Sequence, residues 1–240
     1  MSSGFHFHSL HFVVIIAGTN AIPVSIGKNP MLGQHYQGDI LNPLKFKSNV
    51  LSQQWPHKTM VYKIGFGFST EEQRLIFDAM NEIQSKTCIK FRQASYFWDR
   101  DYVIYTKVAT GCSAHVGKTG GQQFINLEPG CFNGGHTITM HETIHALGIG
   151  HEHNRPDRDN FVIIYYDRIM PEHRYAFEKD DSNTFGVPYD YSSIMHYRKD
   201  AFAIRPWETT IAPKTMGTVM GESTHLSNGD TEKLKRMYRC

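Results

Sequence analysis

The chain has 240 residues, of which 40% are hydrophobic and 20% charged, so it can build one sizeable globular domain and is not intrinsically disordered. Its formal net charge is +2, and positive and negative residues are interspersed without a cluster of Lys and Arg. This distribution argues against a nucleic-acid partner. Four cysteines with wide spacing predict two disulfides made in an oxidising compartment, although four buried free thiols in a cytosolic protein would give the same count.

The first 21 residues resemble a secretory signal peptide. Residues 12–18 form a short apolar run, and Thr19, Asn20 and Ala21 have the small-residue character of a cleavage site. The run is too short to cross a membrane, and we find no later stretch that could span one. We therefore expect a secreted, extracellular protein without a membrane partner.

Periodic patterns predict the elements of the fold in chain order. Four stretches have the composition of strands: residues 61–67, 88–91, 102–108 and 123–127. A capping pattern at Ser69 begins a helix after the first strand, and residues 137–147 form a second helix that ends at Gly148. The chain beyond that glycine is rich in loops, and we expect a short final helix over residues 229–237.

The sequence from His141 reads His-Glu-Thr-Ile-His-Ala-Leu-Gly-Ile-Gly-His and predicts a catalytic zinc site. His141 and His145 lie one helical turn apart, so both imidazoles can reach one ion at about 2.1 Å. Gly148 can adopt a positive φ and turn the chain, which brings His151 back as a third ligand. Three protein ligands leave one coordination position open, as in catalytic sites, whereas structural zinc sites usually have four ligands rich in Cys.

Glu142 follows the first ligand and is free to act as a general base. It can take a proton from water that the metal activates and pass that proton to the leaving amine. A lone H-E-x-x-H can be a solvated helix face, but its extension through Gly148 to His151 rarely arises by chance. With a methionine turn, the extended pattern is the signature of the metzincins.

The flanking residues resemble the astacin branch of the metzincins. The third histidine is followed by Glu152-His153-Asn154-Arg155-Pro156-Asp157-Arg158-Asp159, and a methionine turn follows at Ser193-Ile194-Met195-His196-Tyr197. The resemblance runs from about residue 38 to residue 240. It implies an α+β fold: a two-lobed, metzincin-type catalytic domain with a twisted mixed sheet and two long helices in the N-terminal lobe. The C-terminal lobe would be irregular, with a short final helix, below a horizontal cleft.

The resemblance also implies roles for four residues outside the histidine motif. Met195 would form an apolar floor beneath a single Zn²⁺ ion. Tyr197 would be an additional zinc ligand that moves to stabilise the oxyanion formed beside the metal. Glu152 would anchor the N-terminus of the mature enzyme. Asp39 would occupy the open zinc position of an inactive precursor as an inhibitory ligand. For Tyr197, Glu152 and Asp39 the plainer alternatives are a packed tyrosine, a surface carboxylate and a Gly-Asp turn.

The family pattern implies the covalent organisation of the chain as well. It pairs Cys88 with Cys240 and Cys112 with Cys131. It makes residues 123–127 the edge strand that pairs with an extended substrate. Cleavage by a trypsin-like protease after Lys47 would separate a pro-segment, residues 22–47, from the catalytic domain, residues 48–240.

These observations predict a secreted, monomeric zinc endopeptidase with one catalytic domain, made as a zymogen, that hydrolyses internal bonds of extracellular proteins. One alternative is a catalytically inactive metzincin-fold module that binds a target or acts as a toxin. A structural zinc protein is the other. Glu142 and all three histidines are present, and the cysteines lie far from the histidine motif in the sequence, so we favour the enzyme.

Overall fold

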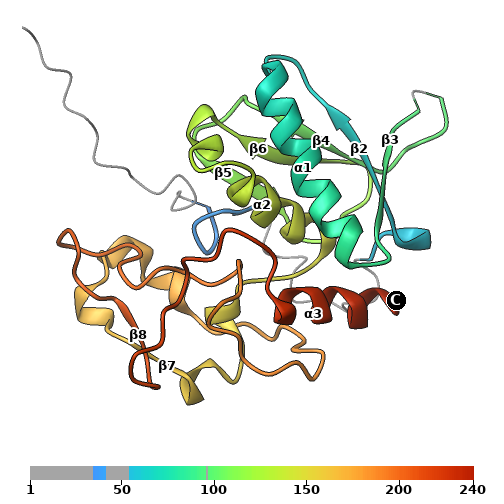
Figure 1. Ribbon diagram of the computed structural model, residues 1–240. Helices are drawn as coiled ribbons and strands as arrows, with labels where there is room; N and C mark the ends of the chain where they lie inside the picture. Colours follow the sequence, from blue (N-terminus) through green and yellow to red (C-terminus); the bar gives the residue numbers. More distant parts are fainter. Residues whose placement is uncertain (1–34, 42–53, 96) are drawn as a thin grey trace, which may run out of the picture.

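The computed structural model describes residues 35–41, 54–95 and 97–240 (Figure 1). The predicted signal peptide and the predicted cleavage site after Lys47 lie outside these residues. Among the helices that the structure describes, none has the length and apolarity needed to cross a bilayer.

A six-stranded mixed sheet lies in the upper half of Figure 1. The strands are β1 (Ile40–Leu41), β2 (Thr59–Ile64), β3 (Lys90–Gln93), β4 (Tyr102–Thr106), β5 (Cys112–His115) and β6 (Gln122–Leu127). Their spatial order is β1-β5-β6-β4-β2-β3, and every neighbouring pair is parallel except β5 with β6. The predicted α+β fold with a mixed sheet is therefore confirmed.

Two helices pack in the same half of the molecule. Helix α1 (Thr70–Lys86) begins with a capping box. The Ser69 hydroxyl accepts a hydrogen bond from the Glu72 amide, and the Glu72 carboxylate accepts one from the Ser69 amide. Helix α2 (Thr137–Leu147) spans the predicted residues and is buried from Thr139 to its end. Its position inside the core, in contact with α1 and β5, leaves the side chains of α2 little freedom to move.

The second half of the chain is mostly irregular, as predicted. It contains a small antiparallel sheet of β7 (Val162–Ile164) and β8 (Ile211–Pro213), and the final helix α3 (Asn228–Tyr238). Four short 3-10 helices lie among the described residues after α2, at Glu152–Asn154, Arg158–Asn160, Tyr166–Arg168 and Pro171–Phe177. Two others precede α2, at Pro56–Lys58 and Pro129–Phe132. Buried side chains form two separate clusters: one joins the sheet, α1, α2 and α3, and the other includes Phe177, Tyr197 and Phe202. The first cluster also holds Ile194 and Met195 of the methionine turn, so it extends from the sheet into the irregular half of the chain.

The prediction that residues 123–127 form the edge strand is wrong. Strand β6 lies inside the sheet, between β4 and β5. Among the described strands that follow residue 54, β5 is the outermost at one end of the sheet and β3 at the other. Strand β1 from the predicted pro-segment pairs with β5. The sequence of β5, Cys-Ser-Ala-His, has small and polar residues without alternation, so periodicity did not reveal it.

The two disulfides are Cys88–Cys240 and Cys112–Cys131, the pairing that the resemblance implies. The first joins residues 152 positions apart and links the start of β3 to the end of α3. The second joins residues 19 positions apart and links β5 to the 3-10 helix before α2.

Removal of the longer link is expected to destabilise the fold more than removal of the shorter one. Loop-closure entropy predicts that Cys88→Ser with Cys240→Ser lowers the free energy of unfolding by about 5 kcal/mol, against about 3 kcal/mol for the pair Cys112→Ser and Cys131→Ser. Urea denaturation of the full chain measures both values. Equal losses of unfolding free energy in the two double variants would contradict the view that the disulfides act mainly by restricting the unfolded chain.

Candidate metal centre

The three predicted zinc ligands come from one helix and the turn that ends it. His141 and His145 lie on α2, and Gly148 ends the helix with φ of 109°. The Gly148 amide donates to the His145 carbonyl at 2.8 Å. The left-handed residue then redirects the chain, so that His151 returns to face the other two imidazoles.

Substitution of Gly148 by Ala is expected to damage the site as well as the fold. An L-residue at this φ is strained by about 1–3 kcal/mol, and the added Cβ would lie 2.5 Å from Met237 Cε. Gly67→Ala is the matched control, because Gly67 has φ of +92° with no atom within 4 Å of its Cβ position. We expect both variants to lose stability in urea denaturation, but only Gly148→Ala to lose zinc content. Equal zinc content in the two variants would contradict this role.

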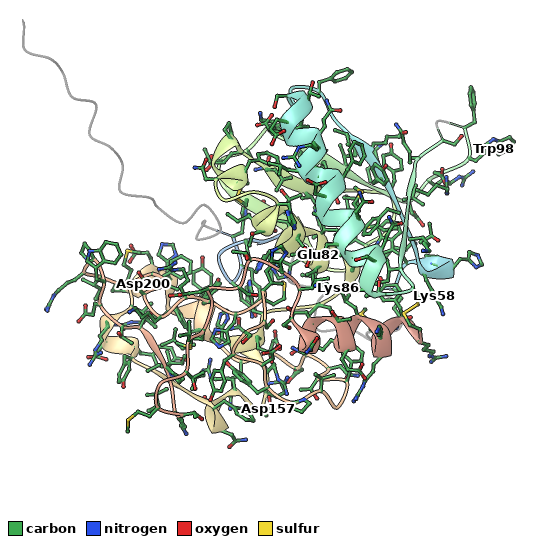
Figure 2. All side chains as sticks on the ribbon, viewed as in Figure 1. Lys58, Glu82, Lys86, Trp98, Asp157 and Asp200 are labelled. Carbon is green, nitrogen blue, oxygen red and sulfur yellow. A yellow bond between two sulfur atoms is a disulfide. The ribbon has the colours of Figure 1, made fainter. Side chains whose placement is uncertain are left out.

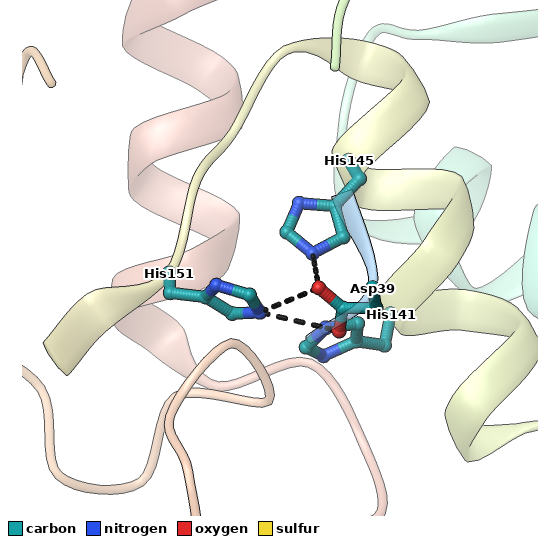
Figure 3. A group of neighbouring side chains, drawn as sticks. All are labelled: Asp39, His141, His145 and His151. Carbon is teal, nitrogen blue, oxygen red and sulfur yellow. Dashed lines mark hydrogen bonds and ion pairs between the residues drawn. The ribbon is translucent and has the colours of Figure 1, made fainter. Parts of the chain in front are cut away.

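The three imidazoles converge on the carboxylate of Asp39 (Figure 3). The Nε2 atom of His141 lies 3.2 Å from Asp39 Oδ2, and those of His151 and His145 lie 3.3 Å and 3.6 Å from Asp39 Oδ1. The four ligand atoms lie within 4.8 Å of one another and all four residues are buried. Two ligands bound tetrahedrally at about 2.1 Å lie about 3.4 Å apart, so these separations fit one ion at the centre of the group.

Backbone and side-chain acceptors fix the tautomer of each histidine. The Nδ1 atom of His141 donates to the Ile194 carbonyl at 2.9 Å, and that of His145 donates to the Ile149 carbonyl at 2.8 Å. His151 Nδ1 lies 3.3 Å from Gln37 Oε1. Because a carbonyl oxygen can only accept, the proton lies on Nδ1 and the Nε2 lone pair is free for a metal.

Unpaired polar atoms at the centre support metal binding. The Nε2 atom of His145, Oδ1 of Asp39 and both carboxylate oxygens of Glu142 are buried, and among the described residues they have no hydrogen-bond partner. Such atoms destabilise a fold unless something else satisfies them. The chemistry of the donor set, imidazole nitrogens with a carboxylate oxygen, is that of catalytic zinc sites.

The two buried carboxyl groups have opposite pKa shifts. Burial alone would raise the pKa of Asp39, but the charge of His151 and the close contacts with the three imidazoles hold that pKa well below its usual range. Burial, and next the charge of Asp39, raises the pKa of Glu142 well above its usual value. Departure of Asp39 would therefore favour the carboxylate form of Glu142 that a general base requires.

Tyr197 is engaged by the predicted pro-segment. Its hydroxyl donates to the Gln37 carbonyl, its ring centroid is 4.9 Å from that of His151, and its ring stacks on His153 at 3.8 Å. Burial, followed by the charge of Asp39, raises the pKa of Tyr197 well above 10. Tyr197 is thus a neutral donor close to the third ligand.

Met195 is fully buried in the core cluster that also holds residues of α2.

Glu152 is buried between two cations. Its carboxylate accepts from Lys233 Nζ, from Arg155 at 3.0 Å and from the Asp190 amide at 2.8 Å. The residues expected to form the mature N-terminus lie outside the described ranges, so its anchoring by Glu152 stays a prediction. In the described residues, Lys233 and Arg155 neutralise this carboxylate.

Two contributors were not predicted from the sequence. Gln37 contacts both His151 and Tyr197, and only its place two residues before Asp39 could have pointed to it. Asp230 accepts from the Ser193 hydroxyl at 2.5 Å and from the Ile194 amide at 2.9 Å, so it fixes the turn whose Ile194 carbonyl orients His141. Asp230 also completes the capping box of α3, a local pattern that conceals its second role.

Comparisons with known proteins agree with this arrangement. Residues 47–239 match the family model described as Astacin, a peptidase family. The chain is 41% identical over 192 residues to zinc metalloproteinase nas-14 of Caenorhabditis elegans, which covers 78% of this chain and 37% of that relative. It is 35% identical over 210 residues to astacin-like metalloendopeptidase of Mus musculus, which covers 85% of this chain and 48% of that relative. High choriolytic enzyme 1, a hatching enzyme zinc-protease from Oryzias latipes, superposes with a TM-score of 0.75 at 34% identity, covering 81% of this chain and 98% of that structure.

A helix with two histidines, a glycine turn to the third and a buried methionine turn together define a metzincin-type zinc centre. The chain belongs to the astacin family. Astacin-family enzymes use one zinc ion, and the group of His141, His145 and His151 fits it. The chain spans less than half the length of the two curated relatives named above.

Proposed function

We propose that this protein is a zinc endopeptidase that hydrolyses internal peptide bonds of extracellular proteins. The proposal rests on the convergence of three Nε2 atoms and on the carboxyl group of the neighbouring residue Glu142, which has no partner within the described part of the chain. When bound, zinc makes water a nucleophile at neutral pH and polarises the carbonyl that is attacked.

The residues of the chain supply the proton transfers and the charge stabilisation. Glu142 takes a proton from the attacking water and delivers it to the leaving amine. Tyr197 keeps its proton at neutral pH, since a phenol ordinarily titrates at about 10, so it can donate a hydrogen bond to the oxyanion that develops on the substrate. The Nδ1 hydrogen bonds to Ile194 and Ile149 hold the imidazoles of His141 and His145 in place throughout.

We further propose that the described form is the zymogen and that β1 occupies the place of substrate. The Ala114 amide of β5 donates to the Asp39 carbonyl at 3.0 Å, so the pro-segment uses the backbone groups that an extended peptide would use. Removal of β1 would leave β5 as a free edge beside the metal centre. Recognition through backbone groups would permit cleavage of many sequences.

The test is cleavage of a denatured protein by the chain processed after Lys47, with and without a zinc chelator. We expect cleavage at internal bonds that stops with the chelator and returns when Zn²⁺ is added back. A folded, processed and zinc-loaded chain that cuts nothing would overturn the proposal, and a catalytically inactive binding module would then be the better account.

A further inference from the structure

A second group of metal-ligating side chains lies outside the catalytic centre. It consists of Glu82 on α1, His136 at the N-cap of α2 and His225 in the loop before α3. Their ligand atoms lie within 4.8 Å of one another, and none of the three belongs to the catalytic group. Figure 2 marks Glu82 and Lys86 on α1. The position of His136, five residues before His141, separates the two groups by about 7.5 Å along the helix.

Both imidazoles point at the same carboxylate oxygen. His136 Nε2 and His225 Nδ1 each lie 2.9 Å from Glu82 Oε2. Their ring planes are tilted by 58° with centroids 5.6 Å apart, so the rings converge on the carboxylate without stacking on each other. Tetrahedral ligands at about 2.1 Å lie about 3.4 Å apart, so small side-chain rotations would place an ion between these three atoms.

The surroundings hold the three groups in place. The other carboxylate oxygen of Glu82 accepts from the Leu226 amide at 2.9 Å and from Lys86 Nζ at 3.0 Å. The Thr137 hydroxyl donates to the Thr224 carbonyl at 3.2 Å, which ties the loop that carries His225 to the start of α2. A satisfied outer shell of this kind fixes the orientation of metal ligands.

Accessibility and charge also suit a metal. The side chain of His225 is 65% exposed and that of Glu82 is 12% exposed, so an ion can enter from solvent and then lie against a partly buried carboxylate. Two imidazoles and one carboxylate are ligands that zinc, copper and nickel prefer over calcium or magnesium. The Lys86 ammonium opposes a cation, but it contacts the oxygen that faces away from the imidazoles.

We propose that Glu82, His136 and His225 form a second binding site for a divalent transition metal, with Zn²⁺ as the probe that tests it. An ion bound there would join α1, the first turn of the active-site helix and the loop before α3. It would therefore stabilise the contact between the two halves of the chain, and water would complete its coordination. This proposal does not depend on peptidase activity.

The experiment is equilibrium dialysis of the full chain against buffered Zn²⁺, followed by metal analysis. The wild-type chain is expected to hold two equivalents, and His225→Asn and Glu82→Gln one equivalent each, with the affinity for the second ion lowered by about 10-fold or more. His57→Asn, at an exposed histidine outside both groups, should keep two equivalents. Thermal melting with added Zn²⁺ should show a second increase in Tm in the wild type and in His57→Asn only.

The outcomes separate this site from the catalytic centre and from loss of folding. A variant that does not fold would lose both equivalents, and the exposed position of His225 makes that variant the decisive one. One equivalent in the wild-type chain would overturn the proposal. Two equivalents in both His225→Asn and Glu82→Gln would overturn it too, because the second ion would then bind elsewhere.

Discussion

Glu142→Gln in the processed chain is expected to lower kcat for peptide hydrolysis by about 10²–10⁴-fold. Glutamine has nearly the shape of glutamate but cannot take a proton at neutral pH. Both oxygens of Glu142 are buried without a partner among the described residues, so no other interaction of this side chain is lost with its charge. The decrease should appear in kcat more than in KM, because the proton transfer belongs to the chemical step.

The control is Glu172→Gln, which neutralises an exposed glutamate and should leave kcat unchanged. Zinc content must also be compared, because Glu142 lies next to the ligand His141. The expected result is full zinc content with little turnover. Activity within about 10-fold of wild type, at equal zinc content, would show that another group accepts the proton.

The catalytic motif could be predicted from the sequence because its determinants are local. His141 and His145 must share a helix face, and Gly148 must end that helix, so spacing alone indicates the arrangement. The structure has the helix at the predicted residues and the left-handed glycine directly after it. The structure also shows that α2 is buried up to its last residue, so the core holds the two histidines of this helix rigidly.

The remaining contacts join residues far apart in the chain, so spacing could not reveal them. The Tyr197 hydroxyl contacts the carbonyl of Gln37, 160 positions away, and His225 reaches Glu82 across 143 positions. Strand β5 was missed for a related reason: Ser113 and Ala114 are buried by elements distant in the sequence, with β6 and β1 on either side and α2 in contact with the strand. Such residues take their structure from neighbours in space, which tertiary packing determines and local propensity does not.

Asp39→Ala in the uncleaved chain is expected to raise peptidase activity by about 10²–10⁴-fold over the uncleaved wild type. Removal of one partner from a buried ionic group costs about 3–5 kcal/mol, so the inhibitory segment should bind more weakly by that amount. This free energy corresponds to the expected range of fold-change in active protein. Among the described residues 35–41, which belong to the proposed pro-segment, Asp39 is the only acidic side chain, and it contacts the three histidines. Without it, the segment is still held by contacts of Gln37 with Tyr197 and His151, by the hydrogen bond from Tyr175 and by the β1–β5 pairing. None of these contacts places a ligand at the metal.

Tyr175→Phe provides the matched comparison, because the Tyr175 hydroxyl donates to the His35 carbonyl of the same segment at 3.0 Å. Loss of one such neutral hydrogen bond removes about 1 kcal/mol, so the uncleaved variant should gain activity by about 5-fold at most. Both variants need Lys47→Ala in addition, so that cleavage by a trypsin-like protease does not supply the activity. A silent but zinc-loaded Asp39→Ala chain would mean that the strand β1, by covering β5, blocks substrate on its own and that the carboxylate is not the inhibitory element.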